Sequence, residues 1–376
     1  MLRERKLTVS VHNPDQYMAA LRTIVAQGRK RIGLLVGAGA SAGMAKPDGT
    51  YPLIPAVAGL TDQVLTTLAP TYQKQIDGLK AELAQHDIET ILSRIRSLSQ
   101  VIGSSKVHDL DGPGFATFGE AICSEIGKIV DVRLPETGSA YADLVNWITG
   151  TTRDYPVEIF TTNYDLLFEE AFESVRAPYF DGWRASSKGE VIRTGQSSAS
   201  HLVFPEHLKY DQTQKAPYAA LLDRLRTFLL TPDTLLISIG FSFADAHIAA
   251  RIDEALAANP SSSVFAFQYK ILDEEGPACD LARRLPNFSV YARDQAKVNG
   301  TRGAWKAPAE LPSKDWGPIR STYMDDKGNF TLGAIEPFAR FFAASRSVQA
   351  FPTQPDLAAL AAEAPPPTAA TASEAK

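Results

Sequence analysis

Three apolar segments each end in a cluster of small or polar residues, and this arrangement restricts the possible fold more than any other feature. The first, "RIGLLVGAGA", runs into Gly37; the second, "VEIFTTNYD", into Asn163; the third, "TLLISIGFSF", into Gly240. Short apolar runs with such stops are typical of buried parallel strands. Because helical patterns follow the second and third, we predict an α/β fold built on a Rossmann-like parallel sheet.

The remaining patterns fit the same class of fold. A helix is expected from Pro14 to near Gly28, and a fourth strand in "SSVFAFQY". A mostly helical insertion spans about residues 60–150, with "DIETILSRIRSL" as its clearest helix, because Ile88, Ile91, Leu92 and Ile95 fall at helical spacing.

The end of the chain differs in composition from the rest. Residues 345–376 form a Pro/Ala-rich segment with too few apolar side chains to order itself. We therefore expect one folded domain over 1–344 and a disordered tail over 345–376.

Composition excludes several classes of function. The net charge of −5 gives no support for a dominant nucleic-acid surface. The two cysteines, Cys123 and Cys279, are too few for a disulfide framework or a four-thiolate zinc site. No window is apolar enough for a signal peptide core or a membrane span. We expect a cytoplasmic protein.

The glycine loop at Gly37, Gly39 and Gly43 suits a phosphate, although alone it is a weak signal. A dehydrogenase would continue into a regular helix, whereas here three prolines interrupt the chain: Pro47, Pro52 and Pro55. This proline-rich loop could close over a nucleotide or form an ordinary surface connection.

The other two strand ends carry the polar groups of a candidate site. Ligands of parallel sheets bind at the carboxyl ends of strands, where this chain places Thr162, Asn163 and Asp165 after one strand and Gly240 and Ser242 after another. The alternative is helix capping, by Asp165 for one helix and by Ser242 or Asp245 for the next. We interpret His247 as structural.

"GAGAS", "TTNYD" and "GFSFADAHI", in this order, resemble the sirtuin-like NAD-binding proteins. "DIETILSRIR", "LVFPEHLKY" and "FTLGAIEPFARFF" are similar to the bacterial antiphage-defence branch, above all to the sirtuin-like partner of the HerA-type ATPase. The resemblance spans roughly Lys30 to Ala344. It implies binding of NAD as substrate and its hydrolysis to nicotinamide and ADP-ribose. The zinc module of sirtuin deacylases needs two cysteine pairs, so we expect no metal.

The resemblance also implies roles for individual residues. Asn163 would hold the water or the nicotinamide ribose, and Asp165 would support the pocket electrostatically. Gly240 and Ser242 would meet the adenosine ribose. The remaining predicted cofactor-binding residues are Thr162 and, as backbone donors to the diphosphate, Gly37, Ala38, Gly39, Ala40 and Ser41.

One motif of the family is missing. Its members carry a His-Gly strand end that supplies a base, whereas this sequence passes directly from "APYFDG" to "WRASSKGEVIRTG". Either the chain has lost the strand between Gly182 and Trp183 or a segment is missing from the sequence; we favour the second, because loss would expose unpaired edges. His201 and His207 do not match the family's base, and His201 is the weak candidate to replace it. Without a base the chain would be a slow or inactive hydrolase.

Three functions therefore remain open: an antiphage NAD hydrolase acting with a HerA-type ATPase, a silent NAD or ADP-ribose sensor, and a nuclease subunit. The third ranks last, because the sequence has no acidic metal-binding cluster. A ring-shaped homo-oligomer is expected from the resemblance and from the general frequency of closed assemblies.

Overall fold

The computed structural model describes residues 10–135, 138–180, 185–186 and 218–345. Its main sheet has eight strands in the order β1-β10-β9-β8-β7-β6-β2-β3. The strands are β1 (Val11–His12), β2 (Arg31–Val36), β3 (Glu158–Thr161), β6 (Thr234–Ile239), β7 (Ser263–Phe267), β8 (Phe288–Tyr291), β9 (Gln295–Val298) and β10 (Thr301–Trp305). Neighbours from β3 to β8 pair in parallel, and β9 is antiparallel to both of its neighbours. The predicted α/β fold with a mainly parallel sheet is confirmed.

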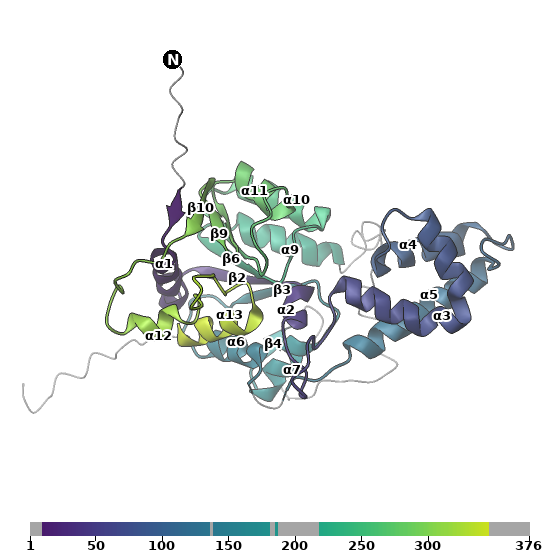
Figure 1. Cartoon of the computed structure of the whole chain (residues 1–376), viewed down its shortest axis with the longest axis horizontal. Helices are drawn as coiled ribbons and strands as arrows, with labels where there is room; N and C mark the ends of the chain where they lie inside the picture. Colours follow the sequence, from purple (N-terminus) through teal and green to yellow (C-terminus); the bar gives the residue numbers. More distant parts are fainter. Residues whose placement is uncertain (1–9, 136–137, 181–184, 187–217, 346–376) are drawn as a thin grey trace, which may run out of the picture.

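Helices cover both faces of the sheet (Figure 1). On one face lie α9 (Tyr218–Leu230), α10 (Ala246–Ala258) and α11 (Pro277–Arg284). The larger core on the other face includes α1 (Pro14–Gln27), α6 (Ala140–Thr149), α7 (Leu167–Ser174) and α13 (Ile335–Ala344). The short helices α2 (Ala38–Ala42) and α12 (Trp316–Arg320), with the hairpin of β4 (Tyr179–Phe180) and β5 (Ala185–Ser186), complete the described elements near the sheet.

The helical insertion forms a lobe at one end of the molecule, made of α3 (Val57–Glu82), α4 (Ile88–Val101) and α5 (Gly112–Val130) (Figure 1). In α4 the predicted residues Ile88, Ile91, Leu92 and Ile95 are all buried. Asp87 caps this helix through a 2.9 Å bond from the Thr90 amide, which explains why it begins where the sequence predicts.

The boundaries of the other predicted elements also agree with the structure. Asn13 caps α1, which ends at Gly28 with a left-handed φ of 66°. Residues 43–56, which contain the three prolines, separate α2 from α3. The division into a domain and a tail stays a prediction, since 346–376 lie outside the described residues. Within the described ranges, no helix is long and apolar enough to cross a membrane.

Candidate functional site

The site lies where the strand order reverses. The central strand β2 has β3 on one side and β6 on the other, so the chain leaves β2 in one direction and later returns on its opposite edge. The carboxyl ends of these strands meet there, as the 3.0 Å bond from the Gly37 amide to the Ile239 carbonyl and the 3.3 Å bond from the Thr162 amide to the Val36 carbonyl show. Ligands of open α/β sheets bind at such switch points.

Glycine is required here because two loops touch. A Cβ added to Gly37 would lie 2.4 Å from the Gly240 carbonyl oxygen, and one added to Gly240 would lie 2.2 Å from the Ala40 nitrogen. Gly240 also has a φ of 66°, a conformation that side chains disfavour. Backbone contact between the β2 and β6 ends therefore accounts for these glycines without a ligand.

The same contact between the two loops uses backbone amides of the glycine loop, which we predicted from the sequence to bind the diphosphate of NAD. The Gly39 amide donates to the Gly240 carbonyl at 2.9 Å, and the Ala40 amide donates to the Gly37 carbonyl at 3.0 Å. Ala38 is partly buried and Gly39 exposed. Phosphate binding by the loop stays a prediction, in which a ligand would compete with these bonds.

Ser41 joins the first two strand ends through its side chain. The residue is 1% exposed, and its hydroxyl donates to Asp165 Oδ2 at 2.7 Å. Asn163 Nδ2 donates to Ser41 Oγ at 3.1 Å, and the Tyr141 hydroxyl lies 2.8 Å from the same oxygen. The structure thus brings together Ser41, Asn163 and Asp165, which we call the Ser41 cluster with Tyr141 included.

Asn163 supplies the side-chain amide of this cluster, and the amide oxygen faces no donor among the described residues. Its Oδ1 is buried and has no hydrogen-bond partner within the described ranges. Buried acceptors without partners are uncommon in proteins and carry a desolvation cost. An unmatched acceptor at a switch point is suited to a donor from a ligand, such as a ribose hydroxyl or a water.

The Asp165 carboxylate has few neighbouring groups that compensate for its removal from water. Removal from water raises its pKa above the ordinary value, while the Ser41 hydroxyl and the Leu167 amide, 3.3 Å from Oδ1, act in the opposite direction. None of the ion pairs between described residues includes Asp165. Its bond from the Leu167 amide links it to the start of α7, but the N-cap residue of that helix is Leu166 and not, as the capping alternative expected, Asp165.

Tyr141 is the member of the cluster that sequence reasoning missed. It lies in the first turn of α6, fully buried, with its ring in edge contact with Phe168 at a centroid distance of 4.6 Å. Burial, followed by the charge of Asp165, raises its pKa well above the ordinary value, so the hydroxyl stays protonated. Nothing in the local pattern of "SAYADLV" marks it, since its role depends on a contact 100 residues away along the chain.

The third strand end presents one polar residue outward. Phe241 and Phe243 are buried, which leaves Ser242 between them exposed. Phe243 adopts a φ of 62°, an uncommon conformation for a bulky residue and a mark of local backbone strain. Asp245 caps α10 through bonds from the His247 and Ile248 amides, which confirms the capping interpretation, and His247 itself is exposed.

The helical lobe reaches the site at Tyr164. The Tyr164 hydroxyl donates to Glu89 Oε1 of α4 at 3.0 Å. Burial first, and then the Glu89 carboxylate, raise the pKa of Tyr164 well above its usual range. The insertion thus contacts the residue between Asn163 and Asp165.

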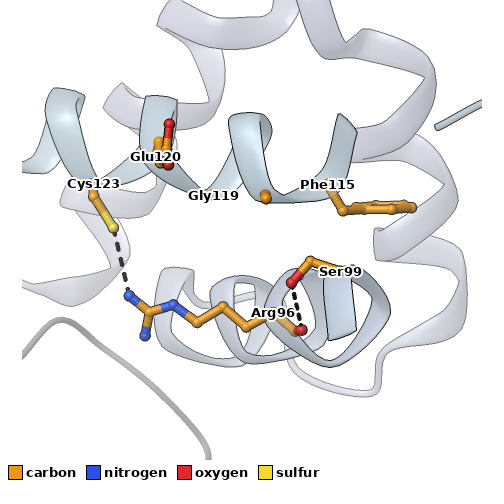
Figure 2. A pocket seen from close by; sticks show the side chains of 7 residues that line it. Arg96, Ser99, Phe115, Gly119, Glu120 and Cys123 are labelled. Atoms are coloured by element: carbon orange, nitrogen blue, oxygen red, sulfur yellow. Dashed lines mark hydrogen bonds between the residues drawn. The ribbon is translucent and has the colours of Figure 1, made fainter. Parts of the chain in front are cut away.

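A separate cavity of about 350 Å³ lies between α4 and α5 (Figure 2). Arg96, Ser99, Phe115, Glu120 and Cys123 line it with two small residues, and the Arg96 guanidinium donates to Cys123 Sγ at 3.7 Å. None of its lining residues belongs to a strand end, so it is not part of the switch-point site. In the part of the chain that the structure describes, no three His, Cys, Asp or Glu side chains gather to hold a metal ion.

The SIR2-like domain family model matches residues 157–285, about a third of the chain. The match runs from β3 to the end of α11, so it includes the Asn163 and Gly240 strand ends but not the Gly37 loop. It supports a SIR2-like protein, and because domains of this family are often NAD-dependent enzymes it implies binding of NAD. No curated protein matches the chain.

Several predicted features fall outside the described residues: His201, His207 and the junction between Gly182 and Trp183. Close to that junction, Tyr179–Phe180 pairs antiparallel with Ala185–Ser186. β3, whose single neighbour in the described sheet is β2, is the outermost strand on that side.

Proposed function

We propose that this protein hydrolyses NAD to nicotinamide and ADP-ribose, with NAD bound over the carboxyl ends of β3, β2 and β6. The observation that carries the proposal is the buried, unmatched Asn163 Oδ1 in the Ser41 cluster, in which Ser41 also binds the Asp165 carboxylate. The SIR2-like match over both strand ends supports NAD as the ligand.

The chemistry requires little of the protein beyond positioning and charge. Cleavage breaks the bond between ribose C1′ and the pyridinium nitrogen, whose electron pair stays on the neutral nicotinamide. A water oxygen adds to C1′ and releases a proton. The ribose passes through an oxocarbenium-like state, which the negative charge of Asp165 would stabilise, while Asn163 Oδ1 would accept a hydrogen bond from the water or a ribose hydroxyl.

The wider role rests on the resemblance. We propose that the enzyme is a cytoplasmic component of bacterial antiphage defence, assembles into a ring and acts with a HerA-type ATPase, depleting NAD on infection. The contact of the helical lobe with Tyr164 would give a partner on that lobe a route to the site.

A silent NAD or ADP-ribose sensor is the second candidate. Among the described residues, no histidine takes part in the hydrogen bonds of the Ser41 cluster. A site without a base would bind NAD and turn it over slowly or not at all.

Nicotinamide release from NAD by the full chain, alone and with the ATPase partner, separates the two. We expect release by the wild type and a loss of about 10²-fold or more in Asn163→Ala, with ADP-ribose binding retained. His247→Ala, a change at an exposed residue in the first turn of α10, after the β6 strand end, is the control and should stay active. Tight NAD binding without release in any assembly would favour the sensor.

A further inference from the structure

The Ser41 hydroxyl is saturated with hydrogen bonds, and their directions follow from valence. A hydroxyl has one hydrogen and two acceptor positions. The hydrogen of Ser41 points to Asp165 Oδ2, and Asn163 Nδ2 uses one acceptor position. The Tyr141 hydroxyl, 2.8 Å away, must therefore donate to the second.

The orientation of the Asn163 amide depends on this saturation. If the amide were reversed, Oδ1 would face Ser41 Oγ, which has no hydrogen left to offer. The protein thus presents Nδ2 to Ser41 and turns Oδ1 away, where it has no partner within the described ranges. The ligand-facing acceptor is set by hydrogen bonds on the opposite side of the amide.

We propose that Tyr141 is a positioning residue of the NAD-cleaving site, which acts through Ser41 to orient Asn163 and Asp165. The inference rests on the proposed function and adds a residue from α6 to it. Because the phenol is fully buried and rigidly packed on Phe168, its hydroxyl is a fixed donor. Its hydrogen bond fills the second acceptor position of Ser41. This bond keeps the serine hydroxyl from rotating away from Asp165.

A matched pair of variants tests the proposal. Tyr141→Phe removes one hydroxyl and keeps the ring. Tyr323→Phe does the same to another fully buried tyrosine, whose hydroxyl donates to Asp15 at 2.6 Å far from the switch point. We expect kcat for nicotinamide release to fall about 3- to 10-fold in Tyr141→Phe, the loss of one net hydrogen bond, with KM for NAD within about twofold. In Tyr323→Phe we expect kcat to stay at the wild-type value.

A double-mutant cycle tests whether Tyr141 acts through Ser41. In a Ser41→Ala background, Tyr141→Phe should cause no further fall in kcat, because the oxygen it orients is gone. Three outcomes would each overturn the inference: an unchanged kcat in Tyr141→Phe, equal losses of kcat in Tyr141→Phe and Tyr323→Phe, or additive losses in the cycle. Nicotinamide release by the wild type would uphold the proposed function in all three cases. No release by the wild type with its partner would overturn the proposed function, and the inference with it.

Discussion

Asp165 and Asp15 each accept a hydrogen bond from a hydroxyl, yet only Asp15 is paired with a cation. Arg320 binds Asp15 through two nitrogens, and the Tyr323 hydroxyl adds a third bond. Asp165 is bonded to Ser41 and an amide, and removal from water raises its pKa. A carboxylate neutralised by arginine is typical of structural support, whereas one held by neutral donors keeps its charge available for a ligand.

Substituting Asp165 should separate activity from stability most strongly. Asp165→Asn keeps the shape and removes the charge that we assign to the oxocarbenium-like state. We expect nicotinamide release to fall about 10²- to 10³-fold, with a melting temperature equal to or above that of the wild type, because a poorly compensated charge has gone. A lowered melting temperature would show that Asp165 is structural like Asp15.

Asp15→Asn is the corresponding substitution at the other carboxylate, and we expect it to affect stability and not activity. It leaves Arg320 without its charged partner, so we expect a loss of about 3 kcal/mol in the free energy of unfolding. The kcat of the folded fraction should match the wild type. A fall in kcat larger than the unfolded fraction explains would break the distinction between the two carboxylates.

The pH dependence of both properties follows from the raised pKa of Asp165. The folded chain keeps this proton to a higher pH than the unfolded chain, whose value is near 3.8, so the group's contribution to stability falls as pH rises through that window. The activity that needs the ionised form rises over the same interval. We expect kcat to drop about tenfold per pH unit below the raised pKa, measured from nicotinamide release at fixed ionic strength.

The Asp165→Asn variant is the control for this fall of kcat at low pH and should not show it. If kcat of the variant fell at the same pH, the titration would belong to another group.

The smallest effects are expected from alanine substitutions at two buried serines, Ser238 and Ser41, which should differ in their effect on kcat. Ser238 in β6 is fully buried and its hydroxyl has no partner within the described ranges, so Ser238→Ala should change the free energy of unfolding by less than about 1 kcal/mol. Ser41→Ala should lower kcat by about 10-fold or more, because it removes the hydrogen bonds that hold Asn163 and Asp165 in place. Chemical denaturation and steady-state rates measure both, and equal kcat values in the two variants would contradict a special role for Ser41.

The strands β2, β3, β6 and β7 could be predicted because each is a short apolar run with a clear stop. The β9–β10 hairpin was not predicted, although the sequence carries a strong two-residue turn signal for it, Asn299-Gly300 between Val298 and Thr301, where both residues have positive φ. β1 was not predictable, because its pairing with β10 joins residues almost 300 positions apart.

The polar members of the site were predictable from the strand ends, but their relations were not. Ser41 was assigned a backbone role from the glycine loop, whereas the structure uses its side chain to link Asn163 and Asp165. Tyr141 had no signal, because a buried tyrosine on an amphipathic helix resembles any other core residue. Such contacts depend on tertiary packing that local patterns do not encode.

The interlocked glycines at the ends of β2 and β6 bear on how mutational scans of this protein are interpreted. Gly37 and Gly240 have no space for even one methyl group, because each would strike backbone of the opposite loop. A library selected only for folded protein should therefore reject alanine at both positions. Loss of activity in glycine mutants is then weak evidence for nucleotide binding. A substitution at Asn163, whose buried Oδ1 has no partner among the described residues, is a more informative test.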